Sequence, residues 1–72
     1  MVNVDKLRGI IKEKRETVDS VAAAIGINRA TFYRKMNSGG DNFTVGEVVG
    51  ICKFLGLDVN EAMSIFFDYK VA

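Results

Sequence analysis

Apolar residues recur along this chain at the three- and four-residue spacing of a helix face, and no segment shows the alternation of a half-buried strand. After Asn3, a single apolar stripe predicts a first helix that ends near Arg15. The stripe consists of Val4, Leu7, Ile10 and Ile11.

Two short helices are predicted next, separated by Gly26. Thr17 is suited to cap the first of them, and Asp19 favours the positive end of its dipole. Asn28 is suited to cap the other, which ends in residues 37–40. The inner face of the helix before Gly26 consists of Val21, Ala22 and Ile25.

Two further helices have clear start signals. Thr44 and Glu47 have the spacing of a capping box, and Gly56 marks the end of a helix over residues 45–55. This helix is apolar around most of its circumference, which predicts that it forms the centre of the core. Its apolar residues are Val45, Val48, Val49, Ile51, Cys52, Phe54 and Leu55.

A last helix begins at the capping-box pair Asp58 and Glu61. It is rich in large apolar side chains, namely Val59, Met63, Ile65, Phe66 and Phe67. The predicted fold is therefore all-α, a compact five-helix bundle that forms one domain over residues 1–72.

Composition limits the chemistry that this bundle can perform. The chain has one cysteine, Cys52, and no histidine, so we expect no disulfide within the chain, no metal site and no cofactor. Without a basic partner Cys52 is a poor nucleophile, and we interpret it as a small buried hydrophobe rather than as part of an enzyme. Charges interrupt every long apolar stretch, and the first residues do not resemble a signal peptide, which predicts no membrane contact and a cytoplasmic location.

The small net charge of +1 conceals an uneven distribution. Residues 1–16 contain five cations and three anions, and residues 17–40 contain three cations and one anion. Residues 41–72 contain two cations and five anions, so the basic charge lies in the first half of the chain. Such an asymmetry indicates an anionic partner or, alternatively, only a solvated face.

The stretch "AAAIGINRATFYRKM", residues 22–36, combines a tight turn with a basic helix. If the two helices cross steeply, Ala22 is small enough for the contact and Gly26 tolerates the positive φ of the turn. Ile27, Phe32 and Met36 would then pack inward. The opposite face would present Arg29, Ala30, Tyr33 and Arg34, a surface suited to an electronegative groove.

Three segments of the chain resemble the lambda-type repressor and Cro-like (XRE) helix-turn-helix family of phages and bacteria. They are "TVDSVAAAIGINRATFYRKMNSG", "NFTVGEVVGICKFLGL" and "DVNEAMSIFF", which together cover nearly the whole chain. The segments "FYRKMN", "NFTVGEV" and "EAMSIFF" are similar to small proteins of phages and prophages of Gram-positive bacteria. The resemblance implies a regulator of transcription that binds double-stranded DNA at the nucleoid of a bacterial cell.

The resemblance also implies roles for individual residues. Arg29 would read guanine through a bidentate contact, and Asn28 would cap its own helix, touch a phosphate or read adenine. Ala30 would meet a thymine methyl, while Tyr33 and Arg34 would contact bases or the sugar-phosphate edge. The expected phosphate contacts are Thr17, Lys35, Asn37, Gly40 and Asn42.

Two positions depart from the family pattern. Val18 stands where the family commonly has a glutamine that binds a phosphate and braces the recognition helix. Lys35 stands where an apolar residue is common, so that either Met36 takes over the packing or the helix is rotated slightly. A rotation would change which of Tyr33 and Arg34 faces the groove. Arg8, Lys12, Lys14 and Arg15 are either a solvated face or additional phosphate contacts.

Ile65, Phe66, Phe67 and Tyr69 are more large apolar side chains than one short helix can bury in a monomer. Some of them should therefore belong to the core, and the surplus predicts a dimer patch. A homodimer would place two recognition helices about 34 Å apart on a near-palindromic operator. The same fold also serves protein-binding modules and antitoxin-like autorepressors, whose partner would be a protein antagonist or a toxin.

Overall fold

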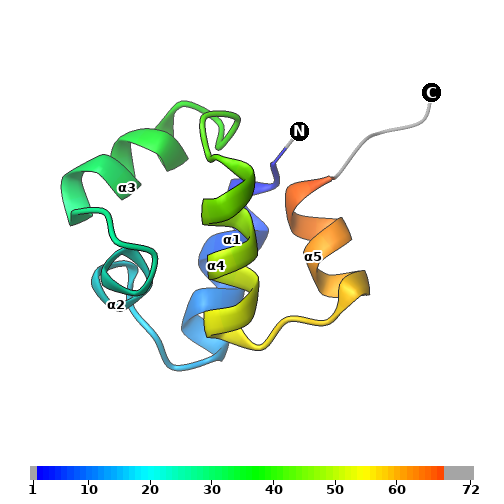
Figure 1. The fold of residues 1–72 in the computed structure, drawn as a ribbon. Helices are drawn as coiled ribbons and strands as arrows, with labels where there is room; N and C mark the ends of the chain where they lie inside the picture. The colour runs from blue at the N-terminus through cyan, green and yellow to red at the C-terminus, as the bar shows by residue number, and fades with distance from the viewer. Residues whose placement is uncertain (1, 68–72) are drawn as a thin grey trace.

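The computed structural model describes residues 2–67, which form five helices and no strand. These are α1 (Val4–Glu13), α2 (Val18–Ala24), α3 (Arg29–Asn37), α4 (Val45–Leu55) and α5 (Val59–Phe66). The all-α prediction is confirmed. In Figure 1, α4 crosses the middle of the molecule, with α2 and α3 on one side of it and α5 on the other.

Hydrogen bonds from side chains start the helices at the predicted positions. The Thr44 hydroxyl accepts from the N–H of Glu47 at 3.0 Å, and a Glu47 carboxylate oxygen accepts from the N–H of Thr44 at 2.9 Å. Asp58 and Glu61 form the same reciprocal pair at the start of α5. At α2, Ser20 completes a capping box with Thr17 that sequence analysis missed, because serine is not the usual residue there.

The first helix ends two residues earlier than predicted. Glu13 is its last residue, and Arg15 has a left-handed backbone with a φ of 59°. The N–H groups of Arg15 and Glu16 donate to the carbonyls of Lys12 and Ile11, which closes the helix end. Sequence analysis missed this end because the left-handed position, usually a glycine, is here an arginine.

One continuous core joins all five helices. Every helix contributes to its centre, and the residues with no more than 1% exposure are Leu7, Val21, Ala22, Phe32, Met36, Ile51 and Ile65. Phe43, in the loop before α4, packs edge-on against Phe32 with 5.2 Å between the ring centroids. This aromatic pair holds the loop against α3.

The prediction that α4 forms the centre of the core holds for only one side of the helix. Ile51 and Leu55 are buried, whereas Val48 and Cys52 are partly buried against the core. Val45, Val49 and Phe54 are exposed, because only one side of α4 faces the other helices. The helix therefore leaves an apolar strip at the surface.

The beginning of the chain is fixed to two distant elements. The N–H of Asn3 donates to the carbonyl of Ile65 in α5 at 2.6 Å. Val2 lies over Gly40, in the loop after α3, and a Cβ at position 40 would stand 2.7 Å from the Cβ of Val2. The absence of a side chain at Gly40 thus permits the close approach of the first residues to this loop.

Candidate nucleic-acid interface

A tight turn orients α3 relative to α2. Gly26 has a φ of 78°, and its N–H donates to the carbonyl of Ala23 at 3.2 Å. The N–H of Ile27 donates to the carbonyl of Ala22 at 3.0 Å, which completes a Schellman motif. Ala22 is buried at the contact between the helices, and Ile27 packs partly buried against the core. The small alanine lets α3 pass close to α2.

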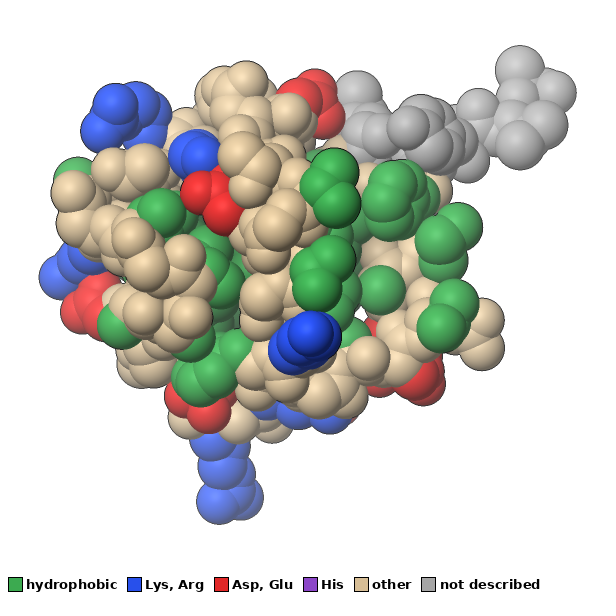
Figure 2. Space-filling model, viewed as in Figure 1, with side chains coloured by type: hydrophobic (Ala, Val, Ile, Leu, Met, Phe, Trp, Pro, Cys, Tyr) green, Lys and Arg blue, Asp and Glu red, His purple; other side chains and the backbone are tan. Residues whose placement is uncertain are grey.

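The inner side of α3 is packed and its outer side is open. Phe32 and Met36 are buried in the core. Arg29, Ala30 and Arg34 are exposed, and Tyr33 is half-buried. In Figure 2, Lys and Arg side chains project around α3, while hydrophobic side chains gather over α4 and α5. The outer face of α3 is accessible to a macromolecule along its length.

Two neighbours orient the guanidinium of Arg29. Its Nε lies 3.1 Å from a carboxylate oxygen of Asp19, in the first turn of α2, and its Cζ lies 5.4 Å from the centre of the Tyr33 ring. The Arg29 and Asp19 side chains are 65% and 60% exposed, so the ion pair adds little stability. Its effect is positional, because only Nε contacts Asp19 and the terminal nitrogens remain for another acceptor.

The side chain of Asn28 caps α3. Its Oδ1 accepts from the N–H of Thr31 at 2.8 Å. A bidentate contact to adenine needs both the oxygen and the nitrogen of the amide, and would break this cap. The geometry favours the cap among the roles expected of Asn28.

Lys35 does not project as a phosphate contact would. Its Nζ lies 2.6 Å from a Glu47 carboxylate oxygen in α4, with the two side chains 20% and 14% exposed. The hydrogen bond from Lys35 lowers the pKa of Glu47, against the smaller opposing effect of burial. Met36 takes the buried position at the end of α3, and Lys35 instead ties α3 to α4.

Gly40 also differs from expectation. It is buried, and its N–H already donates to the carbonyl of Lys35 at 2.9 Å. With Val2 packed over it, the N–H of Gly40 has no access to a phosphate. The N–H of Gly40, which sequence analysis expected to contact a phosphate, is thus used to close the end of α3.

Polar side chains remain at both ends of the α2–α3 unit. Thr17 is exposed at the start of α2, where its oxygen accepts from the N–H of Ser20 and its own hydroxyl proton is still available. At the end of α3, Asn37 Oδ1 accepts from Nη2 of Arg8 at 3.3 Å, and Asn42 Nδ2 donates to Ser38 at 3.2 Å. Arg8 thereby brings a cation of α1 to the end of α3.

The large apolar residues predicted for the last helix divide between core and surface, as far as the structure describes them. Ile65 and Phe66 are buried in the core, because this side of α5 faces α1 and the interior. Phe67 is exposed, and Tyr69 lies outside the described residues.

The described part of the chain shows no helix of the length and apolarity that a membrane span requires. Within residues 2–67, no three His, Cys, Asp or Glu side chains are grouped so that they could hold a metal ion.

Comparisons with curated proteins and with solved structures gave no match to this chain. A comparison with protein families gave a match that spans residues 6–68 and so contains the turn, the basic face of α3 and most of the bundle. The chain belongs to the Cro/C1-type HTH DNA-binding domain family.

Proposed function

We propose that this protein is a sequence-specific transcriptional regulator of the phage repressor or Cro type, which inserts α3 into the major groove of double-stranded DNA. The observation that carries the proposal is the two-sided character of α3. Phe32 and Met36 fix its inner side in the core, while Arg29, Ala30 and Arg34 are exposed on the other side. A rigid helix with such an outer face fits the width of the major groove.

Arg29 is the main base reader in this proposal. Asp19 and Tyr33 hold its side chain at the start of α3, and its terminal nitrogens meet O6 and N7 of guanine. Ala30 contacts a thymine methyl beside it. Tyr33 and Arg34, one turn further along, contact the next bases or the sugar-phosphate edge, whereas Asn28 serves the helix as its cap.

Phosphate contacts at the two ends of the unit set the register of α3 in the groove. Thr17 donates its hydroxyl proton at one end, and Asn37 and Asn42 donate amide protons at the other. Arg8, which reaches Asn37, adds a cationic contact. Lys35 and Gly40 are left out of this set, because both have partners within the fold.

The regulator acts as a homodimer at the bacterial nucleoid. Two copies of α3, about 34 Å apart, read the half-sites of a near-palindromic operator. The similarity of three segments to small phage and prophage proteins supports a role in the gene control of such an element.

Selection of bound duplexes from a random DNA pool at near-physiological salt tests this function. The wild-type protein should enrich one near-palindromic motif. Arg29→Ala should lose preference at one base pair of each half-site by about 5- to 150-fold, which corresponds to the roughly 1–3 kcal/mol of a bidentate contact. Lys12→Ala, a control in the exposed part of α1, should keep the motif.

Circular dichroism of each variant separates loss of binding from loss of folding. If the wild-type protein is folded and still enriches no motif, sequence-specific DNA recognition is wrong for this chain. If Arg29→Ala keeps the full preference, another residue reads the base that the proposal assigns to Arg29.

A further inference from the structure

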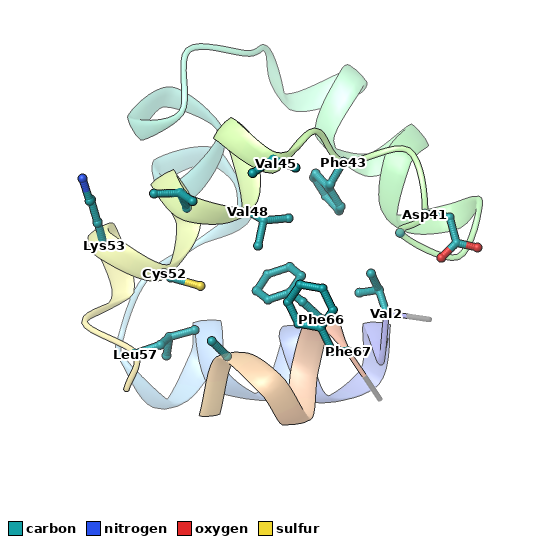
Figure 3. A pocket seen from close by; sticks show the side chains of 13 residues that line it. Val2, Asp41, Phe43, Val45, Val48, Cys52, Lys53, Leu57, Phe66 and Phe67 are labelled. Carbon is teal, nitrogen blue, oxygen red and sulfur yellow. The ribbon is translucent and has the colours of Figure 1, made fainter. Parts of the chain in front are cut away.

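An apolar groove lies between α4 and α5, away from the outer face of α3. Its volume is about 510 Å³, and its walls come from α4, α5, the loop before α4 and Val2. Figure 3 shows Val48, Phe66 and Phe67 in its interior, with Lys53 and Asp41 at opposite ends. Membership in a DNA-binding family does not account for an apolar groove that is open to water.

One stripe of α4 forms an exposed edge of this groove. Val45, Val49 and Lys53 follow one another at four-residue spacing, so they lie on the same side of the helix. Val45 is 82% exposed and Val49 is 45% exposed, and Phe67 of α5 contributes another exposed apolar side chain. Water contact with these side chains is unfavourable, and their burial would stabilise a complex.

The two ends of the groove have opposite charges. Asp41 and Lys53 are its charged lining residues, and both are exposed. Neither side chain has an ion pair or a hydrogen bond to another residue in the part of the chain that the structure describes. A partner that covers the groove with a cation over Asp41 and an anion over Lys53 would therefore complement both ends.

A second copy of the chain provides these charges when its groove faces the first in the reverse direction, so that its Lys53 lies over Asp41 and its Asp41 lies over Lys53. We propose that the α4–α5 groove is the contact between two copies, related by a two-fold axis that crosses the groove at right angles to its length. The inference rests on the proposed function, because it supplies the interface of the proposed dimer. The charges select this axis, since an axis along the groove would place Lys53 against Lys53 and Asp41 against Asp41.

This symmetry gives each residue of the α4 stripe a defined neighbour. Val49 lies at the axis and packs against Val49 of the second copy. Val45, one turn before it, packs on the aliphatic stem of Lys53 from the second copy, whose ammonium then reaches Asp41. Each copy contributes one Lys53 and one Asp41, so two identical ion pairs flank the apolar centre.

A small-molecule ligand fits this groove less well. Ligand sites combine apolar walls with a few polar groups that converge on the ligand. Here the charged groups stand at the two ends of the groove, and the side chains between them in Figure 3 include Val48 and Phe66. An extended self-complementary surface explains this separation.

Charge reversal tests whether Asp41 and Lys53 contribute attraction across the interface. Sedimentation equilibrium of the full chain over the micromolar to millimolar range should show a monomer–dimer equilibrium for the wild type. Asp41→Lys and Lys53→Asp should each weaken self-association by about tenfold or more, because each turns two attractive contacts into two repulsive ones. An equimolar mixture of the two variants should dimerise again, because each variant presents the charges that the other needs.

The apolar part of the interface has a matched control within the chain. Val45 and Val59 are the first residues of α4 and α5, both follow a capping residue, and they are 82% and 76% exposed. Only Val45 lines the groove. Val45→Glu should abolish the dimer, whereas Val59→Glu should leave it unchanged, and both variants should remain folded by circular dichroism.

Three results would overturn the inference. They are a wild-type chain that stays monomeric at millimolar concentration, a mixture of Asp41→Lys and Lys53→Asp that does not dimerise, and a dimer that Val59→Glu disrupts as much as Val45→Glu does. Binding of monomers to single half-sites in the same samples would then leave the proposed DNA function standing. A charge-dependent dimer that selects no DNA motif would support the interface and refute that function.

Discussion

Arg15 adopts a backbone conformation that is energetically unfavourable for a residue with a side chain. Its left-handed backbone, with a φ of 59°, closes α1 in the same way that Gly26 closes α2 and Gly56 closes α4. A residue with a Cβ costs roughly 1–2 kcal/mol more than glycine in this conformation. Glycine loses more freedom on folding, which offsets part of that difference.

Arg15→Gly should therefore raise the free energy of unfolding by about 0.5–1 kcal/mol. Urea denaturation at neutral pH measures the change. Arg15→Ala is the control, because it removes the same charge but keeps the Cβ and its strain. Equal stability of the two variants would show that charge, rather than backbone conformation, governs this position.

At the same scale, the proposed reading of a base depends on the terminal nitrogens of Arg29. Sequence analysis predicted Arg29 as the base reader from its place at the start of α3. It did not predict that Asp19, ten residues earlier, would hold the Nε atom. No local pattern marks that pair, because α2 and α3 must first cross before the two side chains meet.

At the scale of elements, the ion pair between Lys35 and Glu47 connects α3 to α4. Glu47 also caps the start of α4 through the N–H of Thr44, so that one carboxylate joins a helix start to the neighbouring helix. The ring of Phe43 lies 5.9 Å from the Lys35 ammonium and packs on Phe32. This cluster braces α3 against α4 and the loop before it.

The lowered pKa of Glu47 makes this brace sensitive to pH. Its contribution to stability is fully present above the ordinary pKa of 4.5 and is lost as the pH falls through the lower pKa of the folded state. Glu47→Gln should therefore lower the stability at neutral pH and flatten its decline in acid.

Thermal denaturation at several pH values checks this prediction against Glu61→Gln. Glu61 holds the same capping-box position in α5, and within residues 2–67 it forms no ion pair. A decline in acid that is the same in Glu47→Gln as in the wild type would show that other carboxylates set the pH dependence.

The starts of α4 and α5 were predictable because their signals are local. Thr44 with Glu47 and Asp58 with Glu61 lie three residues apart, and their hydrogen bonds form within one helical turn. The buried side of α4 was not predictable, since Val45 and Ile51 are equally apolar and only the position of the other helices exposes one and buries the other. Contacts between residues far apart in the sequence likewise give Lys35 its ion pair and bury Gly40, Ile65 and Phe66.

For the whole molecule, the small size of the core limits stability. A chain of 72 residues typically has a free energy of unfolding of roughly 4–10 kcal/mol. Phe32 is fully buried where α3 meets the loop before α4. Its loss would remove packing from α3 and from the core at once.

Phe32→Ala should lower the free energy of unfolding by about 3–5 kcal/mol and leave much of the protein unfolded at 37 °C. Far-UV circular dichroism during heating shows the loss of the cooperative transition. Phe32→Leu keeps most of the volume and should still melt cooperatively. A melting curve of Phe32→Ala close to that of the wild type would mean that the aromatic pair is not central to the fold.

The contacts of the first residues affect the choice of a purification tag for this protein. Val2 and Asn3 join the loop after α3 to the last turn of α5, and the same loop forms part of the groove wall. A purification tag at the start of the chain would add bulk next to Val2 and Asn3, whose contacts lie beside both this loop and the groove. Measurements of operator affinity and of self-association should therefore use protein from which such a tag has been cleaved.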